Sequence, residues 1–306
     1  MSSPSVHVRA PGKINVYLGV GPRHDDGYHS LATVFQAVSL YEDVYATLAD
    51  EFTLEVFGDV DVSDVPTDDR NLAMRAAKLL AQTAGITSGV HLRIRKGVPV
   101  AGGMGGGSAD AAATLVACDA LWGTDLGMHR LHELAARLGA DVPFTLHGGT
   151  AIGTGRGDEL TPALARGRFD WVLVLSDQGL STPEIYRKLD VLRAQDAPVA
   201  DDPPLSLDVP LAVLQALRAG DAAGLAPVLM NDLEAPALAD RPDLARVLAD
   251  GIRFGALGGL VSGSGPTIAL LCEGSEQAQT VQNELQATGH DALHVHGPVP
   301  GARVIA

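Results

Sequence analysis

A run of glycines in the middle of the chain is its strongest candidate for chemistry. Residues 99–109 read Pro-Val-Ala-Gly-Gly-Met-Gly-Gly-Gly-Ser-Ala, with five glycines between Gly102 and Gly107. Glycine has no Cβ, so its backbone N–H group can lie close to a ligand. A helix that we expect Ser108 to cap follows directly, and a helix N-terminus supplies unpaired donors and roughly half a positive charge. This combination predicts a phosphate-binding loop.

Two common phosphate-binding patterns do not fit this loop. The Walker pattern requires lysine and then serine or threonine after its last glycine, whereas Ser108 and Ala109 follow Gly107 here. The dinucleotide pattern Gly-x-Gly-x-x-Gly fails because Ser108 stands at its last position. The alternative is a glycine-rich turn without a ligand. That alternative is disfavoured, because such a run has a large entropic cost unless another group must approach closely.

Composition limits both the core and the partners. The 306 residues are 46% hydrophobic but only 4% aromatic, so alanine, valine and leucine must fill the core of one large or two ordinary domains. The net charge of −15 disfavours binding to nucleic acid and to anionic membranes. A polyphosphate must therefore be held by local donors and a metal ion.

The two cysteines and the chain's hydropathy predict a cellular location. Cys118 and Cys272 lie in apolar runs, which indicates small core residues in a reducing compartment rather than a disulfide. The first residues lack the apolar core of a signal peptide, and no stretch reaches the ~18 uninterrupted apolar residues of a membrane span. We expect a soluble cytoplasmic protein that binds small molecules, as a monomer or a weak homodimer.

Strands and helices in irregular order must position the glycine loop. Alternating or buried apolar runs predict strands at 6–10, 14–20, 53–57, 90–96, 171–175, 267–272 and 290–296. Apolar periodicity and glycine stops predict helices at 71–84, 108–122, 128–138, 142–146, 183–193, 210–219, 243–254 and 275–288. Residues 10–12 are predicted as a turn or bulge, and 195–210, with four prolines, as an acidic loop. Because βα alternation is irregular, an α+β fold is favoured over a doubly wound sheet.

Three motifs, in order along the chain, resemble those of the GHMP kinases, a superfamily that phosphorylates small molecules with ATP. They are Pro11-Gly12-Lys13-Ile14-Asn15, the loop 99–109, and Val261-Ser-Gly-Ser-Gly-Pro-Thr267. Two further segments are similar to the subgroup whose substrate is a cytidine diphosphate polyol of non-mevalonate isoprenoid synthesis. These segments are Gly27-Tyr28-His29-Ser30-Leu31 and Gly139-Ala-Asp141-Val-Pro143-Phe144.

The resemblance spans residues 10–267 and implies the two-domain GHMP kinase fold. Residues 1–160 would form an ATP-binding domain similar to domain 2 of ribosomal protein S5. Residues 161–306 would form a ferredoxin-like domain that binds the second substrate.

The resemblance also implies roles for individual residues. Lys13 would place an ammonium group beside the reacting hydroxyl and the γ-phosphate, and Asp141 would act as the general base for that hydroxyl. The plain alternatives are a solvated lysine after a Pro-Gly turn and a helix N-cap. Tyr28 and Tyr186 would stack on either side of a cytosine, each contributing about 1–3 kcal/mol. The implied substrate-binding residues are Asn15, Tyr28, His29, Asp141, Thr182 and Tyr186.

ATP and Mg²⁺ are the implied co-substrate and ion. The implied ATP-binding residues are Asn71, Lys96, Pro99, Val100, Ala101, Gly102, Gly103, Met104, Gly105, Gly106, Gly107, Ser108 and Ala109. Mg²⁺ would arrive with ATP and meet Ser108, without a dedicated metal site. Asp110 would add a carboxylate to the first helical turn, or would only complement the helix dipole.

Two other functions remain open at this point. One is a GHMP kinase for homoserine, mevalonate or a sugar, which Tyr28, His29 and Tyr186 oppose because those substrates carry no base. The other is a non-catalytic nucleotide-binding module on the same fold. The presence of both Lys13 and Asp141 opposes the second, because a degenerate module would be expected to lose one of them.

Overall fold

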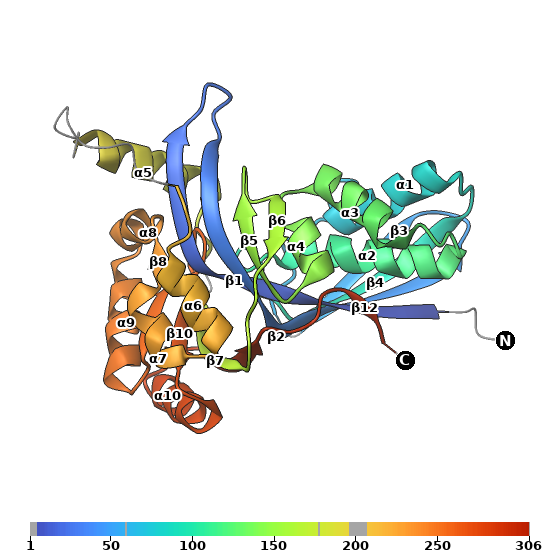
Figure 1. Ribbon diagram of the computed structural model, residues 1–306. Coiled ribbons are helices and arrows are strands. Elements are labelled where there is room, and N and C mark those ends of the chain that lie inside the picture. The colour runs from blue at the N-terminus through green and yellow to red at the C-terminus, as the bar shows by residue number, and fades with distance from the viewer. Residues whose placement is uncertain (1–4, 59, 177, 196–206, 306) are drawn as a thin grey trace.

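Two β-sheets with helices packed on them form the part of the chain that the computed structural model describes, namely residues 5–58, 60–176, 178–195 and 207–305 (Figure 1). The first sheet has the strand order β12-β1-β2-β4-β3, with β5 and β8 pairing with β2 and β1 and β6 pairing with β5. Its strands are β1 (Ser5–Arg23), β2 (His29–Ala49), β3 (Thr53–Gly58), β4 (Gly89–Lys96), β5 (Thr150–Thr154), β6 (Glu159–Pro162), β8 (Met230–Asn231) and β12 (Arg303–Val304).

The helices α1 (Leu72–Ala84), α2 (Gly106–Trp122), α3 (Gly127–Leu138) and α4 (Val142–His147) pack against this sheet. Alanine makes the packing close: α2 buries five alanines between Ala109 and Ala117, together with Cys118. Both cysteines are buried free thiols, as predicted. The low aromatic content is therefore matched by small residues that let helix and sheet approach.

The second sheet confirms the ferredoxin-like expectation. Its strands, β7 (Phe169–Val174), β9 (Gly258–Val261), β10 (Ile268–Cys272) and β11 (Ala292–Gly297), lie in the order β11-β7-β10-β9, and all pair antiparallel. Helices separate β7 from β9 and β10 from β11, as in a βαββαβ unit. These and neighbouring helices are α5 (Thr182–Gln195), α6 (Leu211–Ala219), α7 (Ala222–Leu225), η1 (Ala226–Val228), α8 (Glu234–Asp240), α9 (Pro242–Arg253) and α10 (Ser275–Ala287).

The long antiparallel pair β1–β2 differs most from the sequence-based expectation. The strands predicted at 6–10 and 14–20 are one strand, with a register shift between Pro11 and Gly12, so the bulge alternative is correct. The strand β2 was not predicted. Its central residues 32–38 are all buried, because both faces are covered, and so they show no apolar alternation.

One predicted cap is wrong. The helix α2 begins at Gly106 and its N-cap is Gly105, so Ser108 lies within the first turn instead of capping the helix. Gly105 has a φ of 70°, and this left-handed conformation starts the helix earlier than a serine cap would. Most of the predicted acidic loop 195–210 lies outside the described residues. The predicted division at residue 160 stays a prediction, and β8 and β12 return from the C-terminal half to pair with β1.

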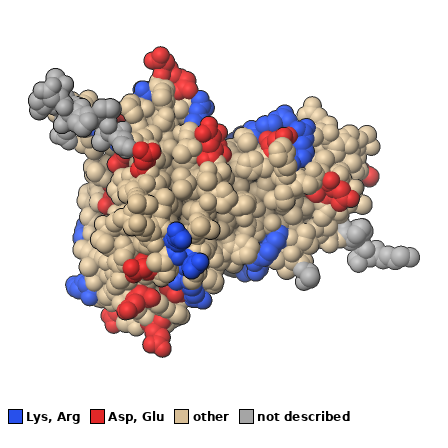
Figure 2. Space-filling model, viewed as in Figure 1, with Lys and Arg blue, Asp and Glu red and all other residues tan. Residues whose placement is uncertain are grey.

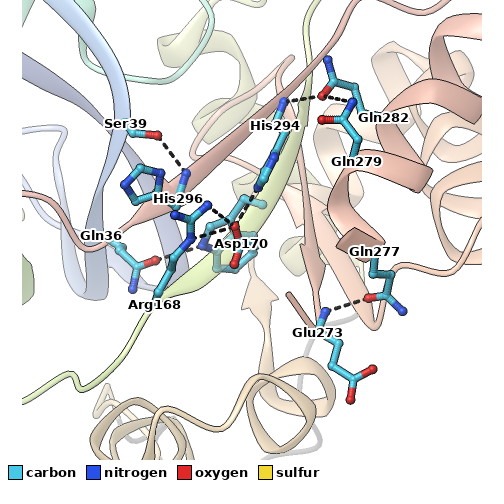
Figure 3. A network of polar contacts seen from close by, with 11 residues as sticks. Gln36, Ser39, Arg168, Asp170, Glu273, Gln277, Gln279, Gln282, His294 and His296 are labelled. Carbon is cyan, nitrogen blue, oxygen red and sulfur yellow. Dashed lines mark hydrogen bonds and ion pairs between the residues drawn. The ribbon is translucent and has the colours of Figure 1, made fainter. Parts of the chain in front are cut away.

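Polar contacts join the two sheets where β7 and β11 face β2 (Figure 3). The Trp171 Nε1–H donates to Gln36 Oε1 at 2.9 Å, and the His296 N–H donates to Ser39 Oγ at 2.9 Å. Beside them, the Asp170 carboxylate accepts from Arg168 and pairs with His294 at 2.7 Å. Gln36 and Trp171 are fully buried, so their bond crosses the junction without competition from water.

The substitution Trp171→Phe tests this junction. It leaves the buried Gln36 Oε1 without its donor, which costs about 1–3 kcal/mol beyond the lost ring atoms. Trp122→Phe is the matched control, because Trp122 Nε1 has no hydrogen-bond partner. Urea denaturation should show a larger loss of unfolding free energy for Trp171→Phe. Equal losses for the two variants would mean that the bond does not stabilise the junction.

Candidate active site

Two cavities meet at the glycine loop. The larger has a volume of about 760 Å³ and the smaller about 330 Å³, and Gly103 and Gly105 line both. The predicted residues on the larger cavity are Lys13, Asn15, Tyr28, His29, Ser108, Asp141, Thr182 and Tyr186. Those on the smaller cavity are Asn71, Lys96, Pro99, Val100, Ala101, Gly102, Met104, Gly106 and Gly107. Ala109 lines neither, because it is buried in α2 and its N–H already donates to the Gly105 carbonyl.

The loop brings three distant segments together through backbone contacts. A Cβ on Gly103, whose φ is 75°, would lie 2.5 Å from the Ser262 carbonyl oxygen, so only glycine fits there. The Lys13 N–H donates to the Met104 carbonyl at 2.9 Å. A Cβ on Gly263 would lie 3.2 Å from Asn15 Oδ1. The three motifs singled out in the sequence therefore form one wall of the larger cavity.

Lys13 and Asp141 lie next to each other on the larger cavity. Lys13 Nζ lies 3.9 Å from Asp141 Oδ2 and donates to Asn15 Oδ1 at 2.8 Å. The Asn15 Nδ2 group donates to Thr33 Oγ1, which fixes the amide with its oxygen toward the lysine. The Lys13 residue is only 6% exposed, so it is not the solvated lysine of the plain alternative.

Asp141 occupies the N-cap position of α4, but its side chain makes no capping hydrogen bond. The plain alternative of a capping aspartate is therefore correct for the position and wrong for the bond. The Asp141 side chain is 35% exposed. Its carboxylate opens onto the larger cavity, beside Lys13 Nζ.

Aromatic side chains lie farther along the same cavity, where α5 runs beside the β1–β2 pair (Figure 1). Tyr28 follows the loop after β1 and is 56% exposed, whereas Tyr186 projects from α5. The His29 ring lies 5.1 Å from the Tyr186 ring, and His29 Nε2 is 2.8 Å from Asp190 Oδ1. Burial, and then the nearby Asp141 carboxylate, raises the pKa of Tyr186, so it stays a neutral phenol.

The opposite end of α5 is tied to the third motif. Thr182 Oγ1 and Ser264 Oγ are 2.8 Å apart, so the start of α5 contacts the turn 262–265. Three further residues line the cavity and were not named as site residues from the sequence: Ser264, which lies within the third motif, Arg156 and Asp190. Asp190 follows Tyr186 by four residues, and this helical spacing places both on one face. Arg156 had no local signal, since the partners of its side chain, Asp26 and Tyr28, lie more than a hundred residues away.

Lys96, one of the implied ATP-binding residues, lies at the smaller cavity within a buried cluster of charged groups. Its Nζ lies 2.6 Å from Glu42 Oε1 and 2.6 Å from Asp110 Oδ2, and all three residues are buried. Glu42 Oε2 also accepts the Gly97 N–H. Asp110 is thus an ion-pair partner, which corrects both of its predicted roles. Burial, and then the Asp110 charge, raises the pKa of Glu42 to about 8, against the opposing effect of Lys96.

Asn71 also has a local structural role. Its Oδ1 accepts the Ala73 N–H at 2.8 Å and caps α1, and its Nδ2 donates to the Pro66 carbonyl at 2.8 Å. The residue still lines the smaller cavity beside the loop.

Three features of binding or membrane proteins are not found, one on the face shown in Figure 2 and two among the described residues. Acidic and basic side chains lie scattered on the face in Figure 2 rather than in one broad basic patch. Among the described residues, no helix is long and apolar enough to cross a membrane. Within the same residues, no three His, Cys, Asp or Glu side chains form a group that could hold a metal ion.

The sequence and the fold match a known family of kinases. The family model for the GHMP kinases N terminal domain matches residues 71–149, and the model for the GHMP kinases C terminal domain matches residues 213–291. The chain therefore belongs to the GHMP kinases, which use ATP as a substrate.

Comparison with individual proteins shows which GHMP kinases this chain is similar to. The chain is 58% identical to 4-diphosphocytidyl-2-C-methyl-D-erythritol kinase of Leifsonia xyli subsp. xyli, over 99% of each chain. It is 57% identical to the kinase of the same name from Clavibacter michiganensis subsp. michiganensis, over 99% of this chain and 97% of the relative. A crystal structure of 4-(cytidine 5'-diphospho)-2C-methyl-D-erythritol kinase superposes with a TM-score of 0.77 at 34% identity, covering 95% of this chain and 98% of the other.

The buried carboxyl of Glu42 predicts a pH dependence of stability. Its pKa is about 8 in the fold against an ordinary 4.5, so the folded protein holds an extra proton between these values. This contribution is complete below about pH 4.5 and is lost as the pH rises through about 8. Glu42→Gln does not titrate, so its melting temperature relative to the wild type should rise between about pH 5 and pH 8. A difference in melting temperature that does not change with pH would mean that Glu42 does not carry the extra proton.

The glycine loop yields a second prediction. A Cβ on Gly107 would meet only Leu72 Cδ1, at 3.9 Å, so Gly107→Ala leaves the fold intact while obstructing phosphate approach. We expect the KM for ATP to rise roughly tenfold, equivalent to about 1.4 kcal/mol of binding, with an undiminished melting temperature. Gly106→Ala is the contrasting variant, since its Cβ would lie 2.8 Å from Glu42 Oε1 and should destabilise the protein. An unchanged KM for ATP in Gly107→Ala would contradict phosphate binding at this residue.

Proposed function

We propose that this protein transfers the γ-phosphoryl group of ATP to the 2-hydroxyl of 4-diphosphocytidyl-2-C-methyl-D-erythritol, forming the 2-phosphate and ADP in non-mevalonate isoprenoid precursor synthesis. The observation that carries the proposal is the glycine loop shared by two cavities, with Lys13 and Asp141 on the side of the larger one. The relatives at 57–58% identity are kinases named for this substrate.

ATP occupies the smaller cavity in this proposal, with its phosphates along the loop. The first N–H groups of α2 have no intrahelical acceptors and point toward such an anion. Because Gly103 and Gly105 open onto both cavities, the γ-phosphate can reach the larger cavity while the nucleoside stays in the smaller one. The substrate hydroxyl then approaches from the side of Asp141.

The reaction requires little of the protein beyond position and charge. Asp141 accepts the proton of the hydroxyl, the hydroxyl oxygen bonds to the γ-phosphorus, and the bond to the β–γ bridging oxygen breaks to leave ADP. Lys13 stabilises the charge on the phosphoryl group in transit. Asn15 holds Lys13 in place through the 2.8 Å hydrogen bond to its Nζ.

The far end of the larger cavity suits the cytidine. Tyr28 and Tyr186 present ring faces for the base, and stacking on each contributes about 1–3 kcal/mol. His29 lies beside Tyr186, and its contact with Asp190 fixes the orientation of its ring. Thr182 is the first residue of α5 and lines the same cavity.

Mg²⁺ enters with ATP in this proposal. Ser108 lies in the first turn of α2 and lines the larger cavity, which supports the proposal that its hydroxyl would meet an ion on the phosphates. This single neutral donor fits an ion held mainly by phosphate oxygens and water. When bound, Mg²⁺ would offset phosphate charge that the acidic chain would otherwise repel.

A substrate panel tests the function. ADP release should be fast with 4-diphosphocytidyl-2-C-methyl-D-erythritol and at background with homoserine, mevalonate and galactose.

Asp141→Asn should lower kcat by about 10²–10⁴-fold, since the amide keeps the shape but is not a base. Asp221→Asn is the matched control: Asp221 caps α7 through the Gly224 N–H, and its substitution should leave kcat unchanged. Turnover of homoserine at a comparable rate would refute the proposed substrate.

A further inference from the structure

Arg156 lies over an aromatic ring of the larger cavity. Its guanidinium carbon is 3.9 Å from the centroid of the Tyr28 ring. Its Nη2 group donates to Asp26 Oδ2 at 2.7 Å, and Asp26 Oδ1 in turn accepts the Tyr28 N–H at 3.0 Å. Asp26 therefore binds both the backbone of Tyr28 and the cation that covers its ring.

The segment that carries Arg156 is held in place independently. Arg156 lies in the turn between β5 and β6, between two glycines with positive φ, Gly155 at 65° and Gly157 at 91°. The Gly155 carbonyl accepts the Leu31 N–H at 2.8 Å, and the Arg156 N–H donates to Asp158 Oδ1 at 3.1 Å. The turn is thus joined to the start of β2, directly after Tyr28 and His29.

We propose that Arg156 is a positioning residue for nucleobase recognition: it stacks on one face of the Tyr28 ring and fixes the other face toward the cytosine. The inference rests on the proposed function, because it concerns the base of that substrate. Without a neighbour, a tyrosine that is 56% exposed would be free to rotate about its side-chain bonds. A ring held in place loses less conformational freedom when the base binds.

The same contacts contribute little to folding. The side chains of Arg156 and Asp26 are 51% and 52% exposed, and ion pairs between exposed groups are weak. An exposed cation–π contact is also modest. Removing the guanidinium should therefore change substrate binding without changing the melting temperature.

Arg156→Met tests the proposal in the intact protein. We expect the KM for 4-diphosphocytidyl-2-C-methyl-D-erythritol to rise about three- to tenfold, which corresponds to about 0.7–1.4 kcal/mol, while the KM for ATP and kcat stay within twofold. Arg253→Met is the matched control. Arg253 lies over the Phe254 ring and pairs with Asp250, but it does not line either cavity. An unchanged KM in Arg156→Met, with a wild type that turns the substrate over, overturns the inference alone.

The alternative outcome is a direct contact between Arg156 and the substrate diphosphate, since Arg23 and Arg187 also line this cavity. A Tyr28→Ala background separates the two. If Arg156 acts through the ring, adding Arg156→Met to the Tyr28→Ala variant has no further effect on the KM. With Tyr28 intact, Arg156→Met then weakens competitive inhibition by cytidine and by CDP to the same degree. A loss that persists in Tyr28→Ala, or one confined to CDP, overturns the positioning role. A wild type inactive on the substrate refutes the proposed function instead.

Discussion

Close backbone contact between the glycine loop and the turn 262–265 is the constraint on which the site depends. The Gly103 Cα lies against the Ser262 and Gly265 backbone, where no side chain fits. This contact brings the start of α2 to the third motif, and the Lys13 N–H bonded to Met104 brings β1 to the same place. Groups from three distant parts of the chain are thereby held at fixed separations, which phosphoryl transfer requires more than it requires reactive side chains.

Two buried lysines on either side of this loop have opposite environments. Lys96 Nζ lies between two acidic side chains, Glu42 and Asp110, each at 2.6 Å, so its charge serves the packing of Gly97 and α2. Lys13 has one carboxylate, at 3.9 Å, and a neutral amide at 2.8 Å. Its charge is therefore available to an incoming anion. In a chain with a net charge of −15, this local arrangement rather than the overall field must attract the phosphates.

Local signals were sufficient for much of the site and part of the fold. Glycine stops gave the ends of α1 and α3, and the glycine run predicted the loop. Long-range contacts could not be predicted: Glu42 meets Lys96 across 54 residues of chain, and Arg156 meets Asp26 across 130. The strand β2 was missed because burial on both faces removes its alternation. The Ser108 cap failed because a left-handed Gly105 moves the helix start.

The pairing of β1 with β12 links the first and last described strands of the chain. Val8 is synthesised long before its partner Val304, and Met230 of β8 follows its partner Tyr17 by 213 residues. The edge of β1 therefore stays unpaired with β8 and β12 during most of synthesis. The first sheet therefore cannot be completed until β8 and β12 have been synthesised, late in the described chain.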